Sequence, residues 1–349
     1  MRVFHSDLQA GHSPDRYALG RDVMPARETP DRIDVLLAAL RGAGHEIAAP
    51  RDHGIEPLRT VHTDDYLEFL GTAHARWQAV FPSGPRADWV VPLAFPNRHM
   101  NARPASVVGQ AGHYLSSTTS PIGAGTWPAI MGAAHCAVDG ADSLLAGARE
   151  AYALCRPPGH HAYADVGAGF CYVNNAAVAA HRLAAALGRV AILDIDVHHG
   201  NGTQGIFWHR ADVLFVSVHG DPDGGYPYYA GRADETGEGP GAGFNLNLPL
   251  PLGTADAPWL QAIDTGLRAV QAHAPRALVV SLGFDAHTSD PSALLAVSTA
   301  AFAGAGQRIG AAGLPTLLVQ EGGYAVDALG RNLLSFLDAF QAARPLDRP

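Results

Sequence analysis

Short apolar runs alternate with amphipathic stretches along most of this chain. The apolar runs have the length and composition of strands buried on both faces of a sheet, and they lie at Ala151–Cys155, Val190–Ile195, Val213–Val218, Ala277–Leu282 and Thr316–Val319. Apolar residues at helical spacing predict helices near residues 30–42, 64–80, 128–147, 174–187, 256–273, 299–312 and 326–342. This alternation predicts one α/β domain over residues 1–349, with a mostly parallel central sheet and helices on both faces.

Two long segments interrupt the alternation. Residues 81–105 carry five prolines together with Trp89, Phe95 and Met100, so we expect a long, ordered insertion loop there. Loops of this length usually serve a function, and we expect this one to build the contact between the two chains of a homodimer. Residues 220–243 form a second loop that is rich in glycine and proline.

Composition narrows the class of protein. An apolar fraction of 47% and a charged fraction of 16% are typical of a globular enzyme with an ample core, and no stretch reaches the length of a membrane span. Three cysteines without a Cys-x-x-Cys pair favour a reducing, cytoplasmic location and disfavour a zinc site made of thiolates. The net charge of −9 disfavours nucleic acid as a partner, and the absence of lysine excludes Schiff-base chemistry.

The polar residues that follow the run at 190–195 indicate metal chemistry. Asp194, Asp196, His198 and His199 lie close together in the sequence. Alternation along a strand would direct Asp194, Asp196 and His198 to one face. Buried carboxylates are costly unless a cation or dedicated hydrogen bonds satisfy them, so a metal explains this group better than packing does. A polar strand end that faces solvent is the ordinary alternative.

Three further strand ends carry similar chemistry. His160 and His161 follow the first apolar run, Asp285 follows the fourth, and Glu321 and Tyr324 follow the fifth. Each is weak evidence by itself, since paired histidines are common in surface turns and an aspartate often caps a helix. Functional groups of parallel α/β folds gather at the carboxyl ends of the strands, so the four ends together predict one site.

The segment Gly200-Asn-Gly-Thr-Gln-Gly205 favours a different function. It fits the glycine fingerprint of dinucleotide-binding proteins, and Asp221 lies at the spacing of a ribose-binding acid. A nicotinamide-dependent dehydrogenase is therefore a real alternative. We disfavour it because the cofactor pyrophosphate would lie beside Asp194 and Asp196, whose negative charges repel it, whereas a divalent metal needs them.

Taken together, the motifs resemble those of the zinc-dependent histone deacetylase family. The resemblance covers nearly the whole chain and is carried by Arg156-Pro-Pro-Gly-His-His161, Gly169-Phe-Cys-Tyr-Val-Asn-Asn175, Asp194-Ile-Asp-Val-His-His-Gly-Asn-Gly-Thr203 and Glu321-Gly-Gly-Tyr324. Within the family, the segments 217–222 and 235–243 are most similar to bacterial acetylpolyamine amidohydrolases and histone deacetylase-like amidohydrolases. The resemblance implies the arginase/deacetylase-like fold, with the active site at the carboxyl ends of the strands.

The resemblance implies two metal sites. One zinc ion would be bound by Asp196, His198 and Asp285, and iron(II) or cobalt(II) would be able to substitute for it because the ligands are hard. A potassium ion would be bound by Asp194, by the hydroxyl of Ser217, and by backbone oxygens of Asp196, His198 and Val218.

The resemblance also implies the catalytic and substrate-binding residues. His161 would be the general base and then the general acid, with Asn201 as its partner, and His160 would be paired with Asp194. Tyr324 would donate a hydrogen bond to the oxyanion. Gly169, Phe170 and Tyr226 would line a tunnel for a linear alkyl chain.

The implied activity is metal-dependent deacetylation of an N-acylated amine, either an acetylpolyamine or an acyl-lysine-like compound. One departure matters, because the rim loop Ser116–Ser120 contains no acidic residue to grip a substrate cation. Two other functions remain open: a non-catalytic sensor of acylated ligands, and a binuclear manganese ureohydrolase, whose additional Asp and His ligands have no obvious counterparts here.

Overall fold

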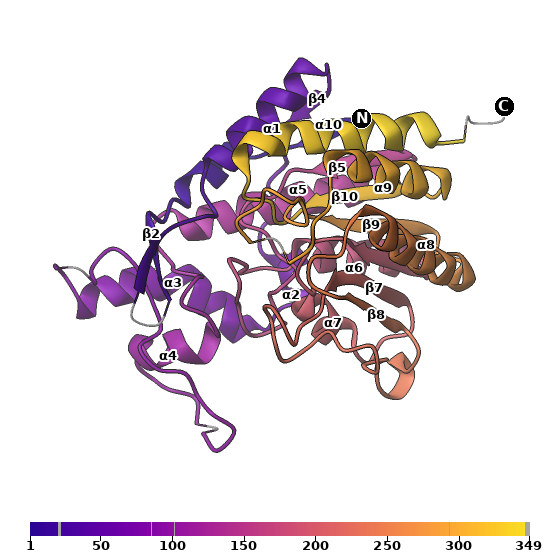
Figure 1. The fold of residues 1–349 in the computed structure, drawn as a ribbon. Helices are drawn as coiled ribbons and strands as arrows, with labels where there is room; N and C mark the ends of the chain where they lie inside the picture. The colour runs from indigo at the N-terminus through magenta and orange to yellow at the C-terminus, as the bar shows by residue number, and fades with distance from the viewer. Residues whose placement is uncertain (20–21, 85, 101, 293, 346–349) are drawn as a thin grey trace.

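An eight-stranded parallel sheet forms the centre of the protein (Figure 1), in a computed structural model that describes residues 1–19, 22–84, 86–100, 102–292 and 294–345. Its strands are β1 Arg2–Phe4, β4 Glu46–Ala48, β5 Glu150–Ala153, β6 Val190–Asp194, β7 Val213–Gly220, β8 Asn245–Leu250, β9 Ala277–Leu282 and β10 Thr316–Gln320. They follow the order β4-β1-β5-β10-β9-β6-β7-β8. A separate antiparallel hairpin consists of β2 Arg16–Leu19 and β3 Asp22–Pro25.

Helices cover both faces of the sheet (Figure 1). One apolar core involves α2 Glu56–Arg59, α3 Asp64–Val80, α4 Val107–Tyr114, α5 Thr126–Leu145, α6 Asn175–Leu187 and α7 Asn201–Phe207. The other involves α1 Asp31–Gly42, α8 Asp256–His273, α9 Thr299–Ala311 and α10 Val326–Ala343. Strand β6 contributes side chains to both cores. Val190 and Ile192 pack into the first core, and Ala191 and Leu193 pack into the second.

The predicted α/β architecture is confirmed, and the structure adds elements that the sequence pattern did not reveal. Strands β1 and β4 have three residues each, which is too short to stand out as apolar runs. Strand β8 is half-buried and alternates polar with apolar residues at the edge of the sheet, so it lacks a continuous apolar run. The short helix α4 was likewise not predicted.

The insertion at 81–105 contains neither a helix nor a strand in its described residues, apart from one bridge between Val90 and Ile122. In the part of the chain that the structure covers, no helix is both long and apolar enough to cross a membrane. The strand order has a consequence for function: β5, β10, β9 and β6 are neighbours, so their carboxyl ends meet at one edge of the sheet.

Candidate active site

Three side chains from two neighbouring strand ends form a compact group of metal-ligating atoms. Asp196 and His198 follow β6, and Asp285 follows β9. One ligand atom of each lies within 4.8 Å of the other two. His198 Nδ1 lies 3.2 Å from Asp196 Oδ1 and 3.1 Å from Asp285 Oδ2. Both carboxylates are completely buried, so a divalent cation would balance charge that the interior otherwise disfavours.

The surrounding backbone is shaped to let these carboxylates approach. The amide of Gly322 donates to Asp196 Oδ2 at 2.8 Å, and the amide of Val197 donates to Asp285 Oδ1 at 3.0 Å. A Cβ atom at Gly322 would lie only 2.3 Å from Asp285 Oδ2 and 2.6 Å from Asp196 Oδ2. Only glycine therefore fits here. Two carboxylates and one imidazole suit zinc and leave coordination positions open for water and substrate.

The strand argument for this group was wrong in detail. Strand β6 ends at Asp194, and residues 195–200 form a bent loop rather than a continuation of the strand. Asp194 Oδ2 lies 3.0 Å from His160 Nδ1 and Asp196 Oδ1 lies 3.7 Å from Nε2 of the same ring, while His198 contacts Asp285. The physical reason is that Asp194 Oδ1 accepts the amide of Asp196 at 3.1 Å, which bends the chain at the strand end.

The adjacent histidines His160 and His161 have opposite electrostatic environments. Burial by itself would lower the pKa of His160, but the carboxylates of Asp196 and Asp194 outweigh it and raise this pKa to about 10. Burial lowers the pKa of His161 well below its usual value, and the charges of His160 and His198 add to that effect. Two neighbouring rings thus favour different protonation states.

The hydrogen bond of His161 fixes its tautomer. Its Nδ1 lies 2.6 Å from Asn201 Oδ1, which can only accept, so Nδ1 carries the proton. The neutral ring therefore presents an unprotonated Nε2.

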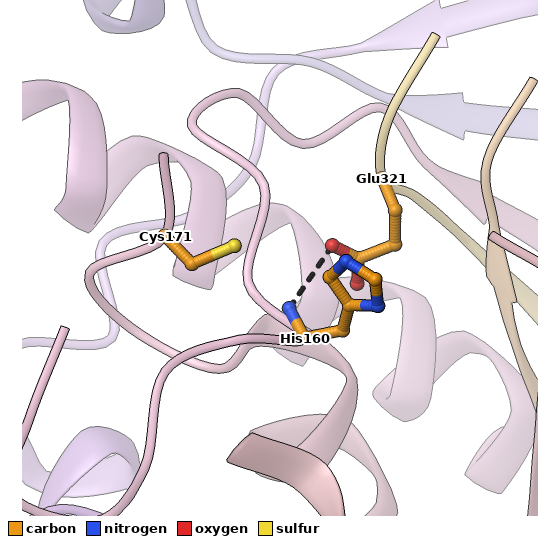
Figure 2. Close-up of side chains that lie close together, drawn as sticks. All are labelled: His160, Cys171 and Glu321. Atoms are coloured by element: carbon orange, nitrogen blue, oxygen red, sulfur yellow. Dashed lines mark hydrogen bonds between the residues drawn. The ribbon is translucent and has the colours of Figure 1, made fainter. Parts of the chain in front are cut away.

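Glu321 anchors the backbone of the histidine loop through two hydrogen bonds. Its Oε2 accepts the amides of Gly159 at 2.7 Å and His160 at 3.1 Å. Figure 2 shows this carboxylate beside His160, with the Cys171 thiol facing the same cluster. Burial raises the pKa of Glu321 to about 7. The sequence motif contained Glu321, but no role was assigned to it.

Three aromatic rings lie close to His161, to His198 or to one another. The ring of Tyr226 lies 4.8 Å from that of His161, and the ring of Phe170 lies 5.5 Å from that of Tyr324. A Cβ at Gly169 would lie 2.5 Å from the His161 ring. Burial raises the pKa of Tyr324 well above 10, so its hydroxyl stays protonated at neutral pH. The structure thus places Gly169 and Tyr226 against His161, and Phe170 against Tyr324.

The rim loop lies next to this approach, because Ser120 Oγ accepts the amide of Phe170 at 3.1 Å. Of the residues expected to bind potassium, Asp194 and Ser217 lie side by side, because they are register partners on β6 and β7. Ser217 Oγ lies 2.8 Å from His219 Nδ1.

The glycine fingerprint has a packing role. The amide of Thr203, near the start of α7, donates to the carbonyl of His160 at 3.1 Å. A Cβ at Gly202 would lie 2.2 Å from the carbonyl oxygen of Ala162. The histidine loop therefore occupies the place where a dinucleotide pyrophosphate would have to bind.

A buried ion-pair network supports the site and was missed by the sequence analysis. Glu28 Oε1 accepts from Arg32 and from Arg156, both at 2.8 Å, and all three residues are buried. Arg32 also donates to the carbonyl of Gly323 at 2.6 Å. The available signal was a charged residue on the apolar stripe of a helix, four residues before Leu36.

Comparisons with known proteins agree with this geometry. Residues 26–340 match the model of the histone deacetylase domain. The chain is 44% identical to acetylpolyamine amidohydrolase 2 of Pseudomonas aeruginosa over 344 residues, which cover 98% of this chain and 99% of that protein. It is 41% identical to the acetylpolyamine amidohydrolase of Mycoplana ramosa over 340 residues, or 97% and 98% of the two chains. The crystal structure of acetylpolyamine aminohydrolase from Burkholderia pseudomallei matches with a TM-score of 0.95 and 43% identity, covering 99% of this chain and 100% of that one.

Proposed function

The chain belongs to the histone deacetylase domain family, and from that membership we propose that it hydrolyses the amide of a small, linear N-acylated amine with the help of zinc. Amide deacetylation and a metal cofactor, generally zinc, follow from the family. The proposal of zinc-assisted hydrolysis rests on one observation: three functional groups lie at the same edge of the sheet. They are the metal-ligating group, a neutral His161 and the Tyr324 hydroxyl.

We propose that Asp196, His198 and Asp285 hold the zinc ion. When bound, zinc polarises the substrate carbonyl and lowers the pKa of water. Iron(II) or cobalt(II) would suit the same ligands. The potassium ion would bind near Asp194 and Ser217, and comparing thermal stability in potassium with stability in choline buffer tests that part.

His161 would move the proton. Its free Nε2 takes the proton of the attacking water while Nδ1–H donates to Asn201, and the ring then delivers that proton to the amine nitrogen as the C–N bond breaks. His160, held by Asp194, orients the water. Acetate and the free amine are the products.

Tyr324 would stabilise the oxyanion. Its hydroxyl is protonated and can donate to the carbonyl oxygen as negative charge develops there. Gly169, Phe170 and Tyr226 would confine the alkyl chain, which selects slender substrates over folded proteins.

The substrate we propose is an acetylated polyamine or a small acyl-lysine-like compound. The names of the similar proteins support the first, whereas the absence of an acid in the rim loop Ser116–Ser120 weakens cation binding there. Parallel rates on acetylputrescine, acetylcadaverine, acetylspermidine and an acetyl-lysine peptide would rank the candidates. Faster turnover of the peptide than of every polyamine would contradict the polyamine assignment.

A histidine variant tests the mechanism. We expect His161→Ala to keep its metal and its fold but to lose about 10²–10⁴-fold in kcat, because general acid–base catalysis contributes that much. The exposed His209 provides the matched control, and His209→Ala should retain full activity. An unchanged rate for His161→Ala with full metal content would refute the mechanism. Activity that survives complete removal of metal by a chelator would refute the cofactor.

We further propose one catalytic domain over residues 1–349, acting in the cytoplasm as a homodimer. The 81–105 loop exposes Leu93, Phe95 and Met100, which supports its role as the dimer contact. The three unpaired cysteines support a reducing compartment. Light scattering on a variant with serine in place of Leu93, Phe95 and Met100 should show monomers. An intact dimer would exclude the loop as the contact.

A further inference from the structure

Asp290 makes an unusual set of contacts for a loop carboxylate. It lies in the loop between β9 and α9, five residues after Asp285, and is 7% exposed. Its Oδ2 accepts two successive backbone amides, from Tyr324 at 2.6 Å and from Ala325 at 2.9 Å. Its Oδ1 accepts the amide of Ser292 at 2.8 Å. All three are charge-assisted hydrogen bonds, which are the strong kind.

The loop that carries Asp290 is itself fixed. The amide of Asp290 donates to the carbonyl of His287 at 2.8 Å. The His287 ring lies 2.8 Å from Ser289 Oγ and 3.2 Å from Thr299 Oγ1, and Thr299 in turn donates to Asn332 of α10 at 2.6 Å. The loop that carries the Asp290 carboxylate is therefore connected by hydrogen bonds to both α9 and α10.

Tyr324 depends on outside support at this point of the chain. It lies directly before Ala325, the first flanking residue of α10, whose side chain makes no capping hydrogen bond. The Tyr324 ring packs against Phe170 and under the guanidinium of Arg32, 4.9 Å from the ring centre. Those contacts restrict the ring, whereas Asp290 restricts the backbone from which the ring projects.

We propose that Asp290 is a positioning residue for Tyr324, holding the phenol hydroxyl where the oxyanion develops. The inference rests on the proposed function, in which Tyr324 donates that hydrogen bond. Because the same loop also carries Asp285, one of the proposed metal ligands, it would fix the distance between the metal and the donor. A displacement of about 1 Å at such a donor can cost about 10²-fold in rate.

A double-mutant cycle between Asp290→Ala and Tyr324→Phe tests the proposal. With the Tyr324 hydroxyl present, we expect Asp290→Ala to lower kcat by about 10–100-fold while KM changes by less than about 2-fold, since only the transition-state contact is lost. In the Tyr324→Phe background the same change should lower kcat by less than about 2-fold, because no hydroxyl remains to be misplaced. Asp290→Asn, which keeps an acceptor for Tyr324 but meets the Ser292 amide with a donor, should fall between wild type and alanine.

Two measurements separate positioning from a general loss of fold. In the metal-free state, the Asp290→Ala variant should exchange hydrogen faster than the wild-type protein in peptides that contain the Tyr324 and Ala325 amides. Exchange in β6 should be the same in both proteins. Asp139, another buried aspartate whose partners are Arg51 and His53, supplies the control: Asp139→Ala should leave kcat unchanged.

The proposal would be overturned if Asp290→Ala lowered kcat equally in both backgrounds, or if it left kcat unchanged. If the alanine variant does not fold, Asp290→Asn is tested in the same double-mutant cycle. If Tyr324→Phe alone leaves kcat unchanged, the role of Tyr324 in the proposed function fails, and the positioning role falls with it. Exchange at Tyr324 would then still report separately whether Asp290 holds the backbone.

Discussion

Replacing Asn201 by aspartate places a negative charge beside the proposed general base without changing the size of the side chain. Asn201 Oδ1 lies 2.6 Å from His161 Nδ1, and both residues are more than nine-tenths buried. Asn201→Asp would therefore keep the hydrogen bond and add a charge. The sign follows directly: a negative neighbour favours the imidazolium, so the pKa of His161 rises.

The magnitude can be bounded from the geometry. Two unit charges about 4 Å apart interact by about 4 kcal/mol at an effective dielectric constant of about 20. At about 1.36 kcal/mol per pKa unit this corresponds to at most about 3 units. Burial of the new carboxylate opposes its ionisation, which reduces the expected rise to about 1–2 units. At neutral pH a larger share of His161 would then be protonated and unable to accept a proton.

The assay is the pH dependence of kcat/KM for Asn201→Asp beside wild type. The acidic limb should move to higher pH, while the rate on the alkaline side of that limb is retained or increased, because a stronger base has been made. Asn201→Ala, which removes the hydrogen bond without adding charge, should lower the rate without moving the limb upward. An acidic limb that stays in place in Asn201→Asp would show that His161 is not the group that must be neutral.

Three further expectations follow from the site and its supports. Glu28→Gln leaves Arg156 and Arg32 buried without their counter-charge, which should lower the free energy of unfolding in urea by about 3–5 kcal/mol. In the wild-type protein these arginines outweigh burial and lower the pKa of Glu28. The stability that the Glu28 carboxylate contributes is therefore present above about pH 4.5 and is lost as the pH falls further. Gly322→Ala should weaken metal binding by about 10–100-fold in a titration of metal-free protein, since its Cβ would displace two ligand carboxylates; unaltered affinity would contradict the proposed ligands. Three buried histidines, each with a pKa of about 4 owing to burial, should lower the stability as the pH falls from about 6.5 to 4, because they stay neutral in the folded chain and take up protons only when it unfolds. The raised pKa of Glu321 acts in the opposite direction over part of this range, so replacing one of these histidines by glutamine should make the fall shallower in scanning calorimetry, and an unchanged slope would contradict this. Those histidines are His12, His62 and His219.

Much of the fold could be predicted from local pattern. Parallel strands that are buried on both faces form continuous apolar runs in the sequence, so β6, β7 and β9 could be predicted. The three-residue β1 and the half-exposed β8 form no such run and could not. The candidate site was recognisable for a related reason: carboxylates and imidazoles directly after buried strands are costly unless they have a use. Asp290 gave no such signal, because an aspartate before proline in a loop is ordinary turn chemistry.

The amino-acid sequence alone determined the fold class and the chemical inventory, since both depend on residues near one another in the chain. The strand order was decided only by tertiary structure. It places β5, β10, β9 and β6 side by side, although residues 153 and 316 are far apart in the sequence. Local periodicity carries no information about which strands pair, because pairing depends on how the two apolar cores close over the sheet. The same long-range packing gathered Asp196, His198 and Asp285 and set Asp290 against the backbone of Tyr324, and it brought His160 to Asp194.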